Sequence, residues 1–99
     1  MITVTVQIKV HPGKEADYEA IGREATAIIE TEEPGNLFFS VNRMDEPGTY
    51  LIVATFKDEA ALKAHEDGAH LAATRAKFAD VIAEPPVRNI YREIEAAAA

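Results

Sequence analysis

The chain has 99 residues, of which 47% are hydrophobic and 27% charged, and its formal net charge is −7. This length fits one domain with a single core, near the size at which self-association often completes burial, so we expect a homo-oligomer. Ten basic residues scattered among seventeen acidic ones exclude a nucleic-acid surface and disfavour an anionic membrane surface. Because cysteine is absent, disulfides, thiolate metal sites and a cysteine nucleophile are excluded.

The first half of the chain predicts a strand followed by a helix. Residues 2–10 alternate apolar and polar side chains, which is the period of a strand and not the pattern of a signal peptide. No segment reaches transmembrane length, so we expect a cytoplasmic protein. Residues 14–32 place apolar side chains at helical spacing, and Glu33-Pro34-Gly35 ends that helix. We expect the acidic residues there, Glu30, Glu32 and Glu33, to form a solvated helix end.

The second half predicts two strands, two helical stretches and a last strand. The strands are expected at residues 36–43, 50–56 and 87–94, with helices after Asp58 and over residues 71–81. Gly68 marks the break between the helices. The run 50–56 is nearly continuous in apolar residues, which is typical of a strand that is buried on both faces.

This order of elements is that of a ferredoxin-like split β-α-β domain, an α+β fold with a four-stranded antiparallel sheet and helices on one face. We expect one domain over residues 1–95 and a frayed alanine tail over residues 96–99. The doubly apolar third strand predicts that a second copy of the chain covers the open face of the sheet.

Short motifs at fixed spacings add a family resemblance. They are Lys9-Val10-His11-Pro12-Gly13-Lys14, Glu33-Pro34-Gly35, and Phe56-Lys57-Asp58 followed by Ala61-Leu62, His65 and His70. Over residues 2–94 the chain resembles the antibiotic biosynthesis monooxygenase family, whose members are small dimeric α+β barrels. The resemblance implies a homodimer that oxidises a small aromatic quinol- or anthrone-like substrate with O2 and without a cofactor. The family also contains haem-degrading and isomerase-like members, so fold alone does not settle activity.

The two histidines near Gly68 are the strongest chemical candidates. His65 follows Leu62 by three positions, near the buried edge of its helix, and is interpreted as a proton acceptor or as a half-buried structural histidine. His70 either contacts the ligand or caps the break near Gly68. A metal site is not expected, because residues five positions apart, such as His65 and His70, do not lie on the same face of a helix and no third ligand is evident nearby. His11 lies in a predicted turn and is expected to be solvated.

Side chains on the strands complete the candidate site. Besides His70, the expected substrate-binding residues are Phe39, Tyr50, Phe56, Arg88 and Asn89. Tyr91 joins His65 as a catalytic candidate, because its hydroxyl can steady a developing oxyanion. Core packing is the alternative for the aromatic residues, and solvation or a dimer salt bridge is the alternative for the arginine.

Two positions depart from the family pattern. Many members carry a glutamate and a tryptophan on the third strand where this chain has Ala54 and Phe56, and Arg75 stands near the place of the axial histidine of haem-degrading members. Haem degradation is therefore disfavoured, and no cofactor is expected. The remaining alternatives are a non-catalytic small-molecule-binding protein of the same fold, and an isomerase in which His65 transfers protons.

Overall fold

The computed structural model describes residues 1–94, so the expected frayed tail over residues 96–99 lies outside the described part. The elements are β1 (Ile2–Lys9), α1 (Glu15–Glu32), β2 (Asn36–Arg43), β3 (Thr49–Phe56), α2 (Glu59–Asp67), α3 (Ala69–Phe78) and β4 (Val87–Arg92). Most bounds lie within one or two residues of the predicted ones. The exception is α3, which ends three residues early because the next residues pair with the end of β1: His11 donates to the Val81 carbonyl, and Val10 bridges Ile82.

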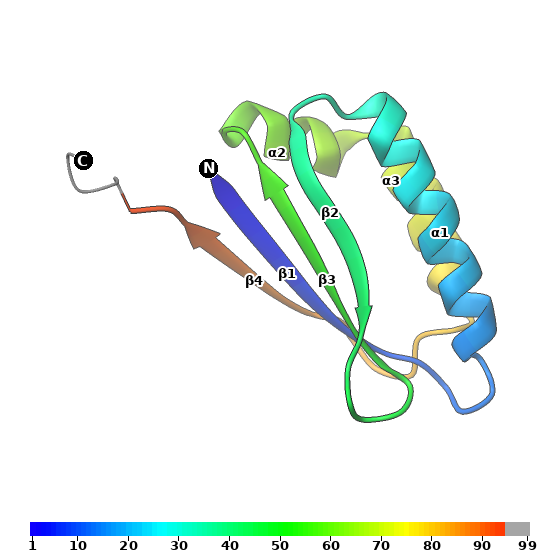
Figure 1. Ribbon diagram of the computed structural model, residues 1–99. Helices are drawn as coiled ribbons and strands as arrows, with labels where there is room; N and C mark the ends of the chain where they lie inside the picture. Colours follow the sequence, from blue (N-terminus) through cyan, green and yellow to red (C-terminus); the bar gives the residue numbers. More distant parts are fainter. Residues whose placement is uncertain (95–99) are drawn as a thin grey trace.

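The four strands form one antiparallel sheet in the order β2-β3-β1-β4, and the helices cover one of its faces (Figure 1). This is the ferredoxin-like α+β fold that the element order predicts. In the described part of the chain, no helix combines the length and the apolar character that crossing a membrane would require.

The core lies between this sheet and the helices. Alternate residues of β1, including Ile2, Val4 and Ile8, are buried on the side of the helices, as the period of two predicts. Tyr18 of α1 and Phe56 of β3 are the largest fully buried side chains. They belong to two separate clusters of buried residues, with Phe56 beside Leu62 and Tyr18 beside Tyr50. Each cluster thus contains one large, fully buried aromatic ring.

A tight corner after α1 brings the end of this helix against α2. A side chain at Gly35 would place its Cβ 2.5 Å from the Cβ of Ala61, so only a glycine allows this approach. The Lys57 amide donates to the Gly35 carbonyl at 2.9 Å, and Asp58 caps α2 by accepting from the Ala61 amide at 2.9 Å. The residue at the C-terminal end of α1, Glu33, therefore lies next to the side chains of α2.

The second face of the sheet is open in the single chain and is partly apolar. Leu51 and Val53 of β3 point to this face, because the residues beside them, Tyr50, Ile52 and Ala54, face the helices. Both are half-buried. Phe38 of β2 and Val87 and Tyr91 of β4 are more than half exposed on the same face. The predicted burial of β3 on both faces is therefore incomplete in one copy of the chain.

Candidate functional site

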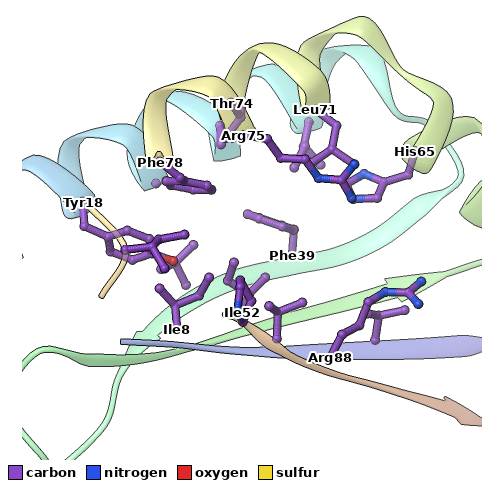
Figure 2. A pocket seen from close by; sticks show the side chains of 18 of the residues that line it. Ile8, Tyr18, Phe39, Ile52, His65, Leu71, Thr74, Arg75, Phe78 and Arg88 are labelled. Atoms are coloured by element: carbon purple, nitrogen blue, oxygen red, sulfur yellow. The ribbon is translucent and has the colours of Figure 1, made fainter. Parts of the chain in front are cut away.

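A cavity of about 680 Å³ lies between the helices and the sheet, within the ~300–1,000 Å³ range of small-molecule sites (Figure 2). Most of its lining is apolar and comes from β1, β2, β3, α1 and α3, as with Val6, Ile8, Phe39 and Phe78. Polar side chains gather toward the end where α2 meets α3, among them His65 and His70. The cavity thus suits a largely apolar molecule with a polar group at that end.

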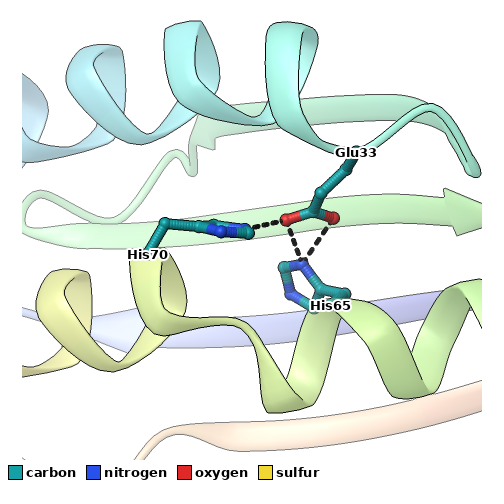
Figure 3. A group of neighbouring side chains, drawn as sticks. All are labelled: Glu33, His65 and His70. Carbon is teal, nitrogen blue, oxygen red and sulfur yellow. Dashed lines mark hydrogen bonds and ion pairs between the residues drawn. The ribbon is translucent and has the colours of Figure 1, made fainter.

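Glu33, His65 and His70 form a hydrogen-bonded cluster at this polar end (Figure 3). His65 Nδ1 lies 2.7 Å from Glu33 Oε1 and 2.8 Å from Oε2, and His70 Nε2 bonds to Oε2. Asn36 donates to Oε1 at 3.2 Å. The prediction that Glu33 is part of a solvated helix end is wrong, because the Gly35 corner turns this side chain inward, where it is only 7% exposed.

The carboxylate sets the protonation pattern of both rings. Burial alone would raise the pKa of Glu33, but the hydrogen bonds from His70, His65 and Asn36 outweigh it, so its pKa lies below the ordinary value and the group is ionised. A carboxylate only accepts hydrogen bonds, so we assign the proton of His65 to Nδ1 and that of His70 to Nε2. His65 Nε2 has no hydrogen-bond partner among residues 1–94, so it is then an acceptor left free on a side chain that lines the cavity.

The same three residues are also the group of described residues whose type and spacing could hold a metal ion, with donor atoms within 4.8 Å of one another. Glu33 is the third candidate ligand, which the sequence does not reveal. Ligands of one zinc ion at ~2.1 Å stand about 3.4 Å apart in a tetrahedron. The nitrogen and oxygen atoms of His65 and Glu33 are closer, at 2.7 Å, which is the spacing of a hydrogen bond.

Four of the expected site residues line the cavity: Phe39, His65, His70 and Arg88. Phe56 does not line it but supports it, because its ring is almost fully buried and packs against His65 with centroids 5.0 Å apart. The packing contact supports the imidazole ring, and the hydrogen bond to Glu33 fixes the rotation of this ring.

Tyr50, Asn89 and Tyr91 lie elsewhere. Asn89 and Tyr91 pair across the sheet with Thr5 and Thr3, so they point to the face away from the helices and the cavity. The Tyr50 hydroxyl donates to Glu19 Oε2 at 2.7 Å, outside the cavity. Burial and this bond raise the pKa of Tyr50 to about 12, so it stays protonated.

The contact between Tyr50 and Glu19 predicts an acid-sensitive element of stability. Hydrogen bonds from Arg43 and Tyr50 lower the pKa of Glu19 from 4.5 to about 2. The ionised form is thus favoured by folding, so its stabilisation is complete above pH 4.5 and is lost as the pH falls toward 2. Urea midpoints measured over this range should fall less steeply for Glu19→Gln than for the native protein. Parallel curves would show that Glu19 plays no such role.

Charged side chains also line the cavity. Arg88 of β4 pairs with Glu66 of α2, and both side chains are about two-fifths exposed. Such exposed pairs contribute little to stability and exchange partners readily. Arg75 of α3 also lines the cavity and makes no hydrogen bond or ion pair within residues 1–94.

The sequence pattern does not single out two residues that line or support the site, Glu33 and Tyr18. Glu33 carried a signal, since it directly precedes the Pro34-Gly35 corner of a recognised motif. Tyr18 was visible only as one apolar position of α1, and its place at the apolar end of the cavity depends on how α1 packs on the sheet.

A split α+β sheet with an apolar cavity under its helices and a carboxylate-histidine cluster at one end defines the class of protein. The model of the antibiotic biosynthesis monooxygenase family matches residues 1–77, which include Glu33, His65 and His70 but not β4. The chain therefore belongs to the antibiotic biosynthesis monooxygenase family.

Individual relatives agree with this membership. A Bacillus subtilis protein, "Putative monooxygenase YcnE", is 27% identical over 85 residues, which are 86% of this chain and 90% of the relative. The crystal structure of a "putative antibiotic biosynthesis monooxygenase" from Caulobacter crescentus is 28% identical, with a TM-score of 0.91 over 95% of this chain and 90% of the other. A Nitrosomonas europaea structure with the same description is 27% identical, with a TM-score of 0.84 over 95% and 99% of the two chains.

Proposed function

We propose that the protein is a cofactor-independent monooxygenase of aromatic quinol- or anthrone-like substrates. The observation that carries this proposal is a histidine, His65, whose Nδ1 is fixed by the buried carboxylate of Glu33 while its second nitrogen remains free at the polar end of an apolar cavity. A positioned base of this kind can take the proton of a phenol. The descriptions of the relatives as monooxygenases support the same class of reaction.

In the proposed reaction, His65 Nε2 accepts the proton of the enol form of an anthrone. The resulting anion transfers one electron to O2, and the superoxide and the substrate radical combine at the ring carbon to form a peroxide anion. The proton held on His65 then converts this anion into a hydroperoxide. Loss of water then leaves a carbonyl, so one O2 converts the ring CH2 into C=O and one H2O. The apolar walls, such as Phe39 and Ile52, keep bulk water away from the radical pair.

Oxygen uptake with anthrones and naphthohydroquinones tests this proposal. We expect the purified protein to consume one O2 per quinone formed, without added metal or cofactor. A protein that binds these compounds but consumes no O2 would instead be the non-catalytic binding member of the fold.

We further propose that two copies pair through the open face of the sheet. The exposed apolar side chains there, Phe38, Val87 and Tyr91, lie on a surface with few charges, and burial of such a patch drives association. Light scattering should show a dimer at micromolar concentration. Phe38→Glu, which adds a charge to a side chain that is 54% exposed in one copy, should give a folded monomer. A monomeric native protein would rule this out.

A further inference from the structure

The cluster of Glu33, His65 and His70 unites two imidazoles and one carboxylate from three parts of the chain. Glu33 follows α1, His65 belongs to α2 and His70 to the first turn of α3 (Figure 3). Two histidine nitrogens and one carboxylate oxygen are a ligand set that proteins use for zinc and other first-row divalent ions. The Glu33, His65 and His70 side chains are only 7%, 14% and 23% exposed, so an ion among them is largely shielded from solvent.

The spacing of the three donor atoms is compatible with an ion after small side-chain rotations. His65 Nδ1 lies 2.7 Å from Glu33 Oε1, whereas two ligands of a tetrahedral zinc ion stand about 3.4 Å apart. This pair has to open by about 0.7 Å, and the widest pair, which is within 4.8 Å, has to close by about 1.4 Å at most. Torsion changes of ~30° or less move the ends of glutamate and histidine side chains this far at modest cost. One ion can therefore replace the two shared protons without movement of the backbone.

Neighbouring residues hold two of the three ligands in place. Asn36 donates to Glu33 Oε1 at 3.2 Å, and carboxylates that bind metal ions commonly accept a second hydrogen bond of this kind. A side chain at Gly68 would place its Cβ 2.8 Å from His70 Cε1 and 3.1 Å from Nδ1, so the glycine makes room for this ring. The orientation of Glu33 and His70 toward each other is thus built into the fold.

We propose that Glu33, His65 and His70 bind one zinc-like divalent ion, and that the bound ion switches off His65 as a base. A neutral imidazole that binds an ion through Nδ1 carries its single proton on Nε2. The free acceptor that His65 presents at the cavity thereby becomes a donor, which cannot take a proton from a substrate. The effect on catalysis rests on the proposed oxygenase function, whereas the binding of the ion does not.

Titration calorimetry of the chelator-treated, full-length protein with Zn²⁺ tests the site without any turnover. We expect one ion per chain with a Kd below about 1 µM, and a higher unfolding temperature when the ion is bound. Mg²⁺ at millimolar concentration should not compete, because it prefers oxygen ligands. His70→Ala should weaken Zn²⁺ binding by about 100-fold or more, since even the loss of a residue that only supports a ligand costs 10- to 100-fold.

Two further variants control for folding and for adventitious binding. Glu33→Gln keeps the shape of the side chain but loses the anionic ligand, so it should also weaken binding in a protein that circular dichroism shows to be folded. His11→Ala removes an exposed histidine outside the cluster and should leave the Kd within about twofold of the native value. Absence of Zn²⁺ binding to the native protein, or binding that persists unchanged in both His70→Ala and Glu33→Gln, would overturn the site.

Oxygen uptake then tests the consequence for His65. Saturating Zn²⁺ should lower the uptake of the native protein at least tenfold, and a chelator should restore it. In His70→Ala, the same Zn²⁺ concentration should leave uptake near the value of that variant without metal. Uptake that is unchanged or raised in the native protein with Zn²⁺ bound would overturn the switch. If Zn²⁺ binds as expected and the metal-free protein consumes no O2, the site stands and only the oxygenase function fails.

Discussion

Replacing His65 by alanine is expected to lower kcat/KM for oxygen uptake by about 10²- to 10⁴-fold, the usual contribution of a positioned general base. The loss follows from the geometry: His65 is the histidine that combines a fixed Nδ1, bonded to Glu33 at 2.7 Å, with a second nitrogen left free at the cavity. The side chain is 14% exposed and packs on Phe56, so some loss of stability will accompany the change. Circular dichroism and thermal unfolding separate this effect from the loss of activity.

His11 offers the matched control for this variant. It is an exposed histidine in the turn after β1, as the sequence predicts, and His11→Ala should leave oxygen uptake within about twofold of the native rate. A folded His65→Ala protein that keeps its uptake would show that the proton is taken by another group or by solvent, and the role of His65 would then be structural.

Replacing Glu33 by alanine is expected to destabilise the fold by about 2–4 kcal/mol, because two largely buried histidines and Asn36 lose their common partner at once. Oxygen uptake should fall as well, since nothing then selects the Nδ1–H tautomer of His65. Urea unfolding at neutral pH measures the first effect. Glu33→Gln keeps the shape of the side chain but loses the charge, so it should restore part of the stability and little of the activity.

Glu32 is the control for this substitution, because it precedes Glu33 at the same helix end but is exposed. Glu32→Ala should change the free energy of unfolding by less than about 0.5 kcal/mol. Equal, small effects at both positions would mean that Glu33 is solvated after all, and that the hydrogen-bonded cluster does not exist in solution.

Local patterns predict the elements of this fold well, because strands and helices follow from side-chain periodicity. The face of the sheet to which each side chain points does not follow so easily. Arg88 and Asn89 are consecutive in one strand, so only one of them can face the helices, and the pairing of Arg88 with Val6 decides that it is Arg88. The same parity sends Tyr91 to the open face. The parity of β4 therefore excludes Asn89 and Tyr91 from the cavity.

The features that the sequence hid depend on contacts between distant segments. In the sequence, Glu33 is one of several acidic residues at a helix end. The close contact of Gly35 with Ala61, which turns its carboxylate toward α2, is a property of the folded chain. Tyr18 reads as a core residue of an amphipathic helix, and the absence of a partner for its hydroxyl among residues 1–94 is a property of the packed core. Periodicity locates such residues on a face, but it does not say what they touch there.

The most direct test of the proposed function is oxygen consumption by the purified native protein with an anthrone as substrate and no added metal or cofactor. We predict one O2 consumed for each anthraquinone formed, at a rate that falls by about 10²-fold or more in His65→Ala. No consumption above the spontaneous rate, by a folded protein that binds the anthrone, would contradict it.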